Sequence, residues 1–136
     1  MGFMISQLPG TRIFVVREEG EGNVGESDAI LEELRRRTTP ADRAGVLFDL
    51  RALRYLPNAA EARYLGERYG QVGAAYAMRM AYLASPGAQY GVARTVEILA
   101  GLRGVEARVF TDETEALGWL REGGAASAGP SEQKSS

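Results

Sequence analysis

The sequence predicts one α/β domain built on a mixed, mostly parallel sheet. Of its 136 residues, 45% are hydrophobic and 25% are charged, which is typical of a single folded domain. Short apolar runs that suit strands alternate with longer segments whose apolar residues recur at helical spacing. The run at residues 46–50 is apolar except for one carboxylate, as in a strand buried on both faces. This alternation favours a parallel sheet covered by helices.

The chain begins with two apolar runs, residues 3–8 and 11–18, separated by Pro9-Gly10. Proline pre-sets one turn dihedral and glycine supplies a positive φ, so the pattern predicts a β-hairpin. Residues 19–25 are rich in glycine and glutamate and predict a loop. Their spacing matches the dinucleotide motif G-x-G-x-x-G, but the glutamates crowding that loop would repel a pyrophosphate.

Capping residues predict where the helices begin. Ser27 is expected to cap a helix that ends at Arg37. Asn58 is expected to cap a long helix that reaches about Tyr76, with Glu61 completing a capping box.

The second half of the chain continues the alternation. Strands are expected at residues 78–84 and 106–110, with a helix at 89–103 between them and a final helix, capped by Thr111 or Asp112, that ends at Leu120. The predicted order is ββαβαβαβα, with about five strands and four helices in one domain, residues 1–122. The small polar residues 123–136 are expected to form a disordered tail.

Three glycines share one stripe of the long helix: Gly66, Gly70 and Gly73. Each interior glycine costs about 1 kcal/mol relative to alanine, so the stripe indicates close approach of another backbone. Packing within this domain explains it, and a homodimer contact is the alternative.

The composition excludes several classes of function. The chain has no cysteine and no histidine, which removes the thiolate as a nucleophile or metal ligand and also the commonest general base and metal ligand. No phosphate-binding or nucleophile motif is present, so we expect no catalytic residues, cofactor or metal site. A formal net charge of −2 argues against binding to nucleic acid. No apolar run reaches the roughly 18 residues of a membrane span, and no signal peptide is apparent, so we expect a cytoplasmic protein.

Three segments resemble a known family. They are VLFDLRALRYLPN (46–58), YGVAR (90–94) and ARVFTDETEALGWL (107–120). They resemble STAS domains, the family of bacterial anti-sigma-factor antagonists, and especially an uncharacterised STAS-like branch sometimes labelled for lipid binding. The resemblance covers residues 3–121 and implies a STAS-like fold. In the antagonists a serine at a helix start is phosphorylated, whereas the matching position here is Asn58, which cannot carry that switch.

Binding surfaces of parallel sheets gather where strands end and helices begin. We therefore expect the loops at residues 51–58 and 85–90 to meet and to form a binding edge. The candidate binding residues on or beside these loops are Asp49, Tyr55, Asn58, Ser85, Tyr90 and Arg94. Asp49 has a structural alternative, because it could simply accept backbone N–H groups from the loop that follows it.

Two hypotheses for function remain. The first is a non-catalytic protein-interaction or signalling module that docks through the helix beginning at Asn58, onto a partner that presents a carboxylate beside an apolar group. The alternative is a carrier or sensor of a small apolar, lipid-like ligand, held between helices and sheet near Tyr55, Tyr82 and Tyr90.

Overall fold

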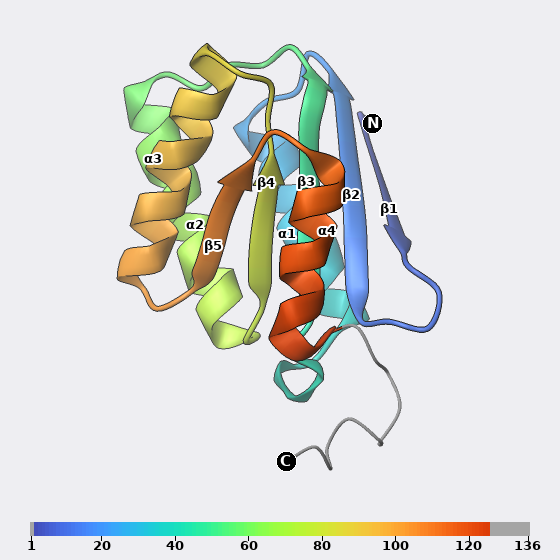
Figure 1. Cartoon of the computed structure of the whole chain (residues 1–136). Helices are drawn as coiled ribbons and strands as arrows, with labels where there is room; N and C mark the ends of the chain where they lie inside the picture. Colours follow the sequence, from blue (N-terminus) through green and yellow to red (C-terminus); the bar gives the residue numbers. More distant parts are fainter. Residues whose placement is uncertain (1, 126–136) are drawn as a thin grey trace.

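The computed structural model describes residues 2–125, which form a five-stranded mixed sheet (Figure 1). Strand β1 is antiparallel to β2, and β2 to β5 are parallel to one another. The strands lie side by side in chain order, β1-β2-β3-β4-β5. Their bounds are β1 Phe3–Gln7, β2 Ile13–Gly20, β3 Gly45–Leu53, β4 Arg79–Leu83 and β5 Glu106–Phe110.

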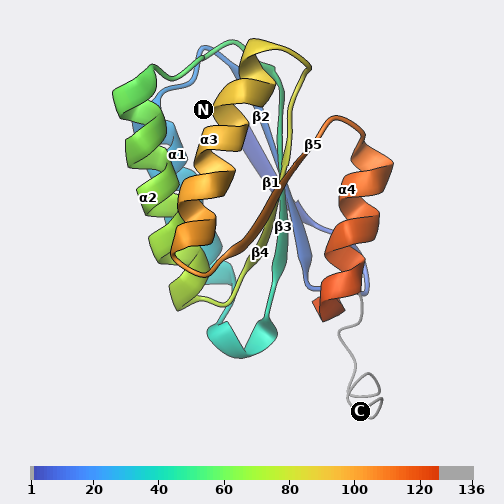
Figure 2. The same ribbon diagram turned by 60° about the vertical axis from the view of Figure 1, so that its left-hand side comes forward.

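The helices form two unequal layers around this sheet (Figure 2). Helices α1 (Val24–Arg37), α2 (Ala59–Ala75) and α3 (Ala88–Leu102) cover one face, and α4 (Glu113–Leu120) covers the other. A 3-10 turn, Pro40–Asp42, precedes β3, and a π-helical turn, Arg121–Ala125, follows α4. Both the mixed, mostly parallel sheet and the order ββαβαβαβα are therefore confirmed. No helix within residues 2–125 is both long enough and apolar enough to cross a membrane.

Each face of the sheet has its own core, because side chains alternate between the faces along a strand. The larger core, beneath α1 to α3, contains the rings of Phe48, Tyr69 and Tyr82 with centroids 5.0 to 5.4 Å apart. The smaller core lies beneath α4 and includes Leu47 and Leu120.

The first helix begins earlier than the sequence suggested. It starts at Val24, and the side chain of Asn23 caps it by accepting a hydrogen bond from the backbone N–H of Glu26 at 2.9 Å. The prediction that Ser27 is the cap was wrong, because Asn23 is an equally strong capping residue one turn earlier. Ser27 instead lies buried on the helix.

The connections at the carboxyl ends of β2 and β3 are shorter than predicted. Strand β2 continues to Gly20, and β3 continues to Leu53, because the two strands keep pairing beyond a register shift between Arg17 and Glu19. The segment between β3 and α2 is therefore only residues 54–58. The predicted capping box of Asn58 with Glu61 is confirmed, and of the two proposed caps for α4 it is Asp112 that accepts a backbone hydrogen bond.

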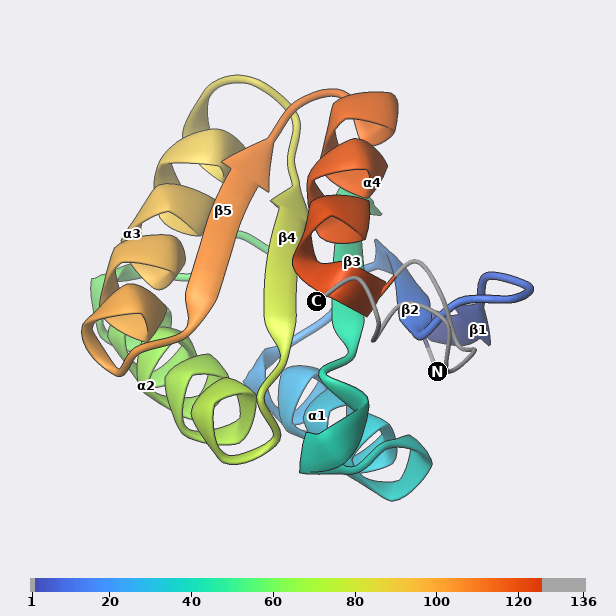
Figure 3. The same ribbon diagram turned by 60° about the horizontal axis from the view of Figure 1, so that its bottom comes forward.

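Helix α2 lies beside α3 (Figure 3), and Gly66 and Gly70 of the glycine stripe face α3, whereas Gly73 faces Val105 and Met80. A Cβ at Gly66 would lie 2.6 Å from the Cβ of Leu99, and one at Gly70 would lie 3.3 Å from the Cα of Ala100. The glycines thus let two helices of one domain approach closely, which is the explanation by packing within the domain, and the homodimer contact stays a prediction. Of the predicted tail 123–136, residues 123–125 continue the π-helical turn, and residues 126–136 lie outside the described part of the chain.

Candidate functional site

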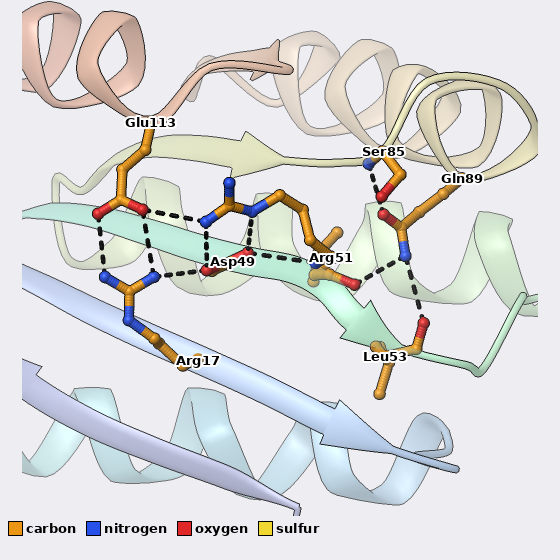
Figure 4. A network of polar contacts seen from close by, with 8 residues as sticks. Arg17, Asp49, Arg51, Leu53, Ser85, Gln89 and Glu113 are labelled. Carbon is orange, nitrogen blue, oxygen red and sulfur yellow. Dashed lines mark hydrogen bonds and ion pairs between the residues drawn. The ribbon is translucent and has the colours of Figure 1, made fainter.

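Gln89 joins the ends of β3 and β4 (Figure 4). Its Nε2 donates to the carbonyl oxygen of Leu50 at 2.7 Å, and its Oε1 accepts from the backbone N–H of Ser85 at 2.7 Å. The two loops that we expected to meet at the carboxyl edge are therefore in contact. Gln89 was not among the predicted residues, because its bonding depends on which strand lies beside its own loop.

Behind Gln89 lies a small cavity, which we call the carboxyl-edge pocket. It lies under residues 55–57, between the sheet and helices α1 to α3, and its volume is about 50 Å³. Leu56, in the covering segment, is 51% exposed and also lines the pocket. Most wall residues are apolar: Leu50, Leu53, Leu65, Val92, Ala93 and Val96. Tyr55 and Tyr82, two of the tyrosines expected around a small ligand, line it as well, whereas Tyr90 does not.

Glu18 places a carboxyl group in the wall of this apolar pocket. Alternation along β2 puts it on the same face as Phe14 and Val16, so the side chain enters the larger core and only 4% of the residue is exposed. Its Oε2 has no hydrogen-bond partner among the described residues. Burial, followed by repulsion from Glu26 and Asp49, raises the pKa of Glu18 to about 8. The group is therefore mostly a neutral carboxylic acid at pH 7.

Tyr55 supplies a second polar group to the pocket. Its hydroxyl oxygen is enclosed and lacks a well-formed hydrogen bond, although the Glu61 carboxylate lies near enough to affect it. Burial, as the larger cause, and Glu61 together raise the pKa of Tyr55 to about 12. The phenol therefore stays protonated over the physiological range and remains a hydrogen-bond donor.

Asp49 lies on the α4 side of the sheet, within a network of ion pairs (Figure 4). Its carboxylate accepts from Arg17 and Arg51, and both guanidinium groups also bind Glu113 in the first turn of α4. It also accepts from the backbone N–H of Arg51 at 3.2 Å, as its structural alternative required. Burial alone would raise the pKa of Asp49, but these hydrogen bonds outweigh it and hold the pKa below its usual range. The arrangement ties α4 to the sheet.

The other predicted residues lie around the pocket rather than inside it. Asn58 is exposed and caps α2, and Ser85 is partly buried beside Gln89. Tyr90 packs partly buried against the larger core. Arg94 is exposed and pairs with Glu97 at 2.7 Å. Within residues 2–125, no cluster of three or more carboxylates is arranged to hold a metal ion.

The fold has a counterpart among solved structures. An uncharacterised protein of the DUF3478 family from Shewanella loihica PV-4, described as having a SpoIIAA-like fold, matches with a TM-score of 0.55 and 21% sequence identity. The match covers 87% of this chain and 91% of that protein. The fold is SpoIIAA-like. This confirms the STAS-like fold expected from the three segments. No protein-family model and no curated protein matches the sequence.

The SpoIIAA-like sheet explains why the pocket lies where it does, since its walls come from the carboxyl ends of β2, β3 and β4 and from the helices that follow. Glu18, like Gln89, was not among the residues predicted from the sequence. The alternation Phe14-x-Val16-x-Glu18 was a usable signal, because it predicts a carboxyl group on the buried face of β2.

Proposed function

We propose that this protein is a non-catalytic binding module that holds a small, mainly apolar ligand in the carboxyl-edge pocket. One observation carries the proposal: an apolar cavity encloses a carboxyl oxygen, Oε2 of Glu18, that has no partner among the described residues. A buried polar group without a partner costs about 1–3 kcal/mol, and a ligand that pairs with it recovers part of that cost.

The size of the cavity restricts how a ligand enters. About 50 Å³ accommodates a few water molecules or a group of a few atoms. The remainder of a larger ligand would extend past Leu56, whose exposed side chain lies over the cavity. Residues 55–57 belong to no helix or strand, so this segment is the part of the wall that moves with least loss of hydrogen bonding.

A pocket-narrowing variant tests the proposal. Val96→Leu adds a methylene group to the wall, and Val72→Leu adds the same group elsewhere in the same core. A library of small neutral and charged apolar compounds is screened by thermal unfolding, since a ligand that binds only the folded state raises Tm, and raises it more the more tightly it binds. We expect hits that stabilise the wild type and Val72→Leu but not Val96→Leu. Hits that stabilise all three proteins equally would place binding elsewhere.

A protein partner is the second candidate. A groove of about 550 Å³ lies between the N-terminal halves of α2 and α3, and we call it the α2–α3 groove. Its wall combines apolar Val92 and Leu99 with Arg63, and α3 begins at Gly87 without a side-chain cap. An extended peptide that presents a carboxylate beside an apolar side chain fits this chemistry.

Two variants separate the second candidate from the first. Arg63→Gln removes the positive charge of the groove, and Asn58→Asp keeps the helix cap while adding a negative charge. Binding of peptides with a C-terminal Leu carboxylate, followed by fluorescence anisotropy, should weaken in both variants. Unchanged affinity in both folded variants would contradict docking at the α2–α3 groove, and neither variant alters the carboxyl-edge pocket wall.

A further inference from the structure

The environment of Glu18 restricts the chemistry of the ligand, provided that the proposed function is right. We propose that the carboxyl-edge pocket selects a neutral ligand with an apolar body and one carbonyl or ether oxygen, which accepts a hydrogen bond from the Glu18 carboxylic acid. Three properties of the pocket support this proposal: the groups facing Glu18, the apolar walls and the small volume.

The groups that face Glu18 are acidic or neutral on every element packed against it. Helix α1 contributes Glu26, and the phenols of Tyr69 and Tyr82 come from α2 and β4. Asp49 of β3 acts on Glu18 only from the opposite face of the sheet, where Arg17 and Arg51 pair with it. One oxygen of Glu26 is itself enclosed and unpartnered, while the other accepts from the backbone N–H of Gly2 at 2.9 Å. Within the described part of the chain no basic side chain lines the pocket, and α3 adds only Gln89 and apolar residues. The surroundings therefore favour the protonated form of Glu18, which is a hydrogen-bond donor.

This arrangement disfavours charged ligands. An anion would meet the field of Glu26 in a site where, among residues 2–125, no guanidinium or ammonium group lines the wall. An ammonium ligand would lose its hydration among leucine and valine side chains, and it would have to remove the proton from Glu18 to gain a counter-ion. A neutral acceptor oxygen avoids both costs and pairs with the carboxyl group of Glu18, whose Oε2 has no partner among the described residues.

The volume also favours a compact polar group. About 50 Å³ fits a carbonyl and a few attached carbon atoms but not a hydrated headgroup. The Tyr55 phenol, also in the wall, offers a second donor to the same oxygen or to water beside it.

Matched probes of six carbon atoms test the proposal: hexan-2-one, hexanoate and hexylammonium. Each is titrated into the ¹⁵N-labelled full chain at pH 6.0 and pH 9.5, and the amide signals of Leu53, Leu56 and Gln89 report occupancy of the pocket. At pH 6.0 we expect hexan-2-one to bind roughly tenfold more tightly than either ion. Its affinity should fall about fivefold to tenfold at pH 9.5, because ionised Glu18 no longer donates the hydrogen bond.

Two variants isolate the role of the carboxyl group. Glu18→Gln keeps an N–H donor and should bind hexan-2-one with no dependence on pH, whereas Glu18→Leu should lose the advantage of the ketone at both pH values. If Glu18→Leu binds the ketone as tightly as the wild type, or if hexylammonium binds best and more tightly at high pH, the proposed ligand chemistry is wrong although the pocket remains a binding site. If no probe shifts the pocket amides at millimolar concentration in the wild type, the ligand chemistry is likewise rejected. The screen with Val96→Leu then decides separately whether the pocket binds anything at all.

Discussion

Replacing Glu18 by glutamine should change how stability depends on pH. Between pH 4.5 and about 8 the folded chain holds a proton on Glu18 that the unfolded chain has released. Stability therefore falls as pH rises through this window, by the linkage between proton binding and folding. The rise of the Glu18 pKa from 4.5 to about 8 corresponds to a loss of about 5 kcal/mol in the free energy of unfolding once the pH is well above 8. Water entering around the ionised group lowers this figure, so it is an upper limit.

Glutamine has nearly the same shape as the protonated acid but does not titrate. We expect Glu18→Gln and the wild type to have similar free energies of unfolding near pH 4.5. Their difference should then grow with pH, until the variant is several kcal/mol more stable at pH 9. The chain has no histidine and no cysteine, so few other groups titrate between pH 5 and 9.

Urea unfolding followed by circular dichroism, at unit steps from pH 5 to 9, measures this difference. Glu19→Gln is the matched control, since Glu19 is the exposed neighbour on the same strand, and its curve should remain parallel to that of the wild type. If the Glu18→Gln and wild-type curves also stay parallel within 0.5 kcal/mol, roughly the resolution of such comparisons, Glu18 is not buried as a neutral acid. The pocket would then contain no carboxylic acid that donates a hydrogen bond at pH 7, and the proposed ligand chemistry would be wrong.

The remaining predictions concern helix packing, the ion-pair network and catalysis. Gly66→Ala should destabilise the domain by roughly 1–3 kcal/mol in urea unfolding, because the new methyl group would overlap Leu99. Gly118→Ala is the control: its methyl group would meet no atom within 4 Å, so the variant should be more stable by up to about 1 kcal/mol. Asp49→Asn should lower the free energy of unfolding by about 1–2 kcal/mol at pH 7, which is less than for a fully buried ion pair because Arg17 and Arg51 are half exposed. The difference between the variant and the wild type should vanish in acid, once the pH falls below the lowered pKa of Asp49 and the wild-type carboxylate is protonated. Esterase, phosphatase and nucleotide-hydrolysis assays should stay at background, and turnover that Asp49→Asn abolishes would refute a non-catalytic function.

The order and type of the elements could be predicted because each one has a local signal. The apolar run at residues 46–50 identified a buried strand, and the capping box at Asn58 located the start of α2. Helix α1 was placed one turn late because Asn23 and Ser27 are both good caps, and only the path of β2 decides between them.

The candidate site was predictable only in part. The meeting of two loops at the carboxyl edge follows from the parallel sheet, but the bonds of Gln89 depend on tertiary structure. Asp49 drew attention as a carboxylate within an apolar run, yet its charge is matched by Arg17 and Arg51. Glu18, by contrast, is buried with no partner for its Oε2 among the described residues, and it stands at the end of a strand, where glutamates are usually solvated.

Because the strands pair in chain order, the sheet is able to grow by adding each newly made unit to the one before it. All residues that line the carboxyl-edge pocket lie between positions 18 and 96. A chain emerging from the ribosome would therefore present the complete wall while β5 and α4 are still being synthesised. An apolar ligand that is present during synthesis would then meet the cavity before α4 covers the opposite face of the sheet.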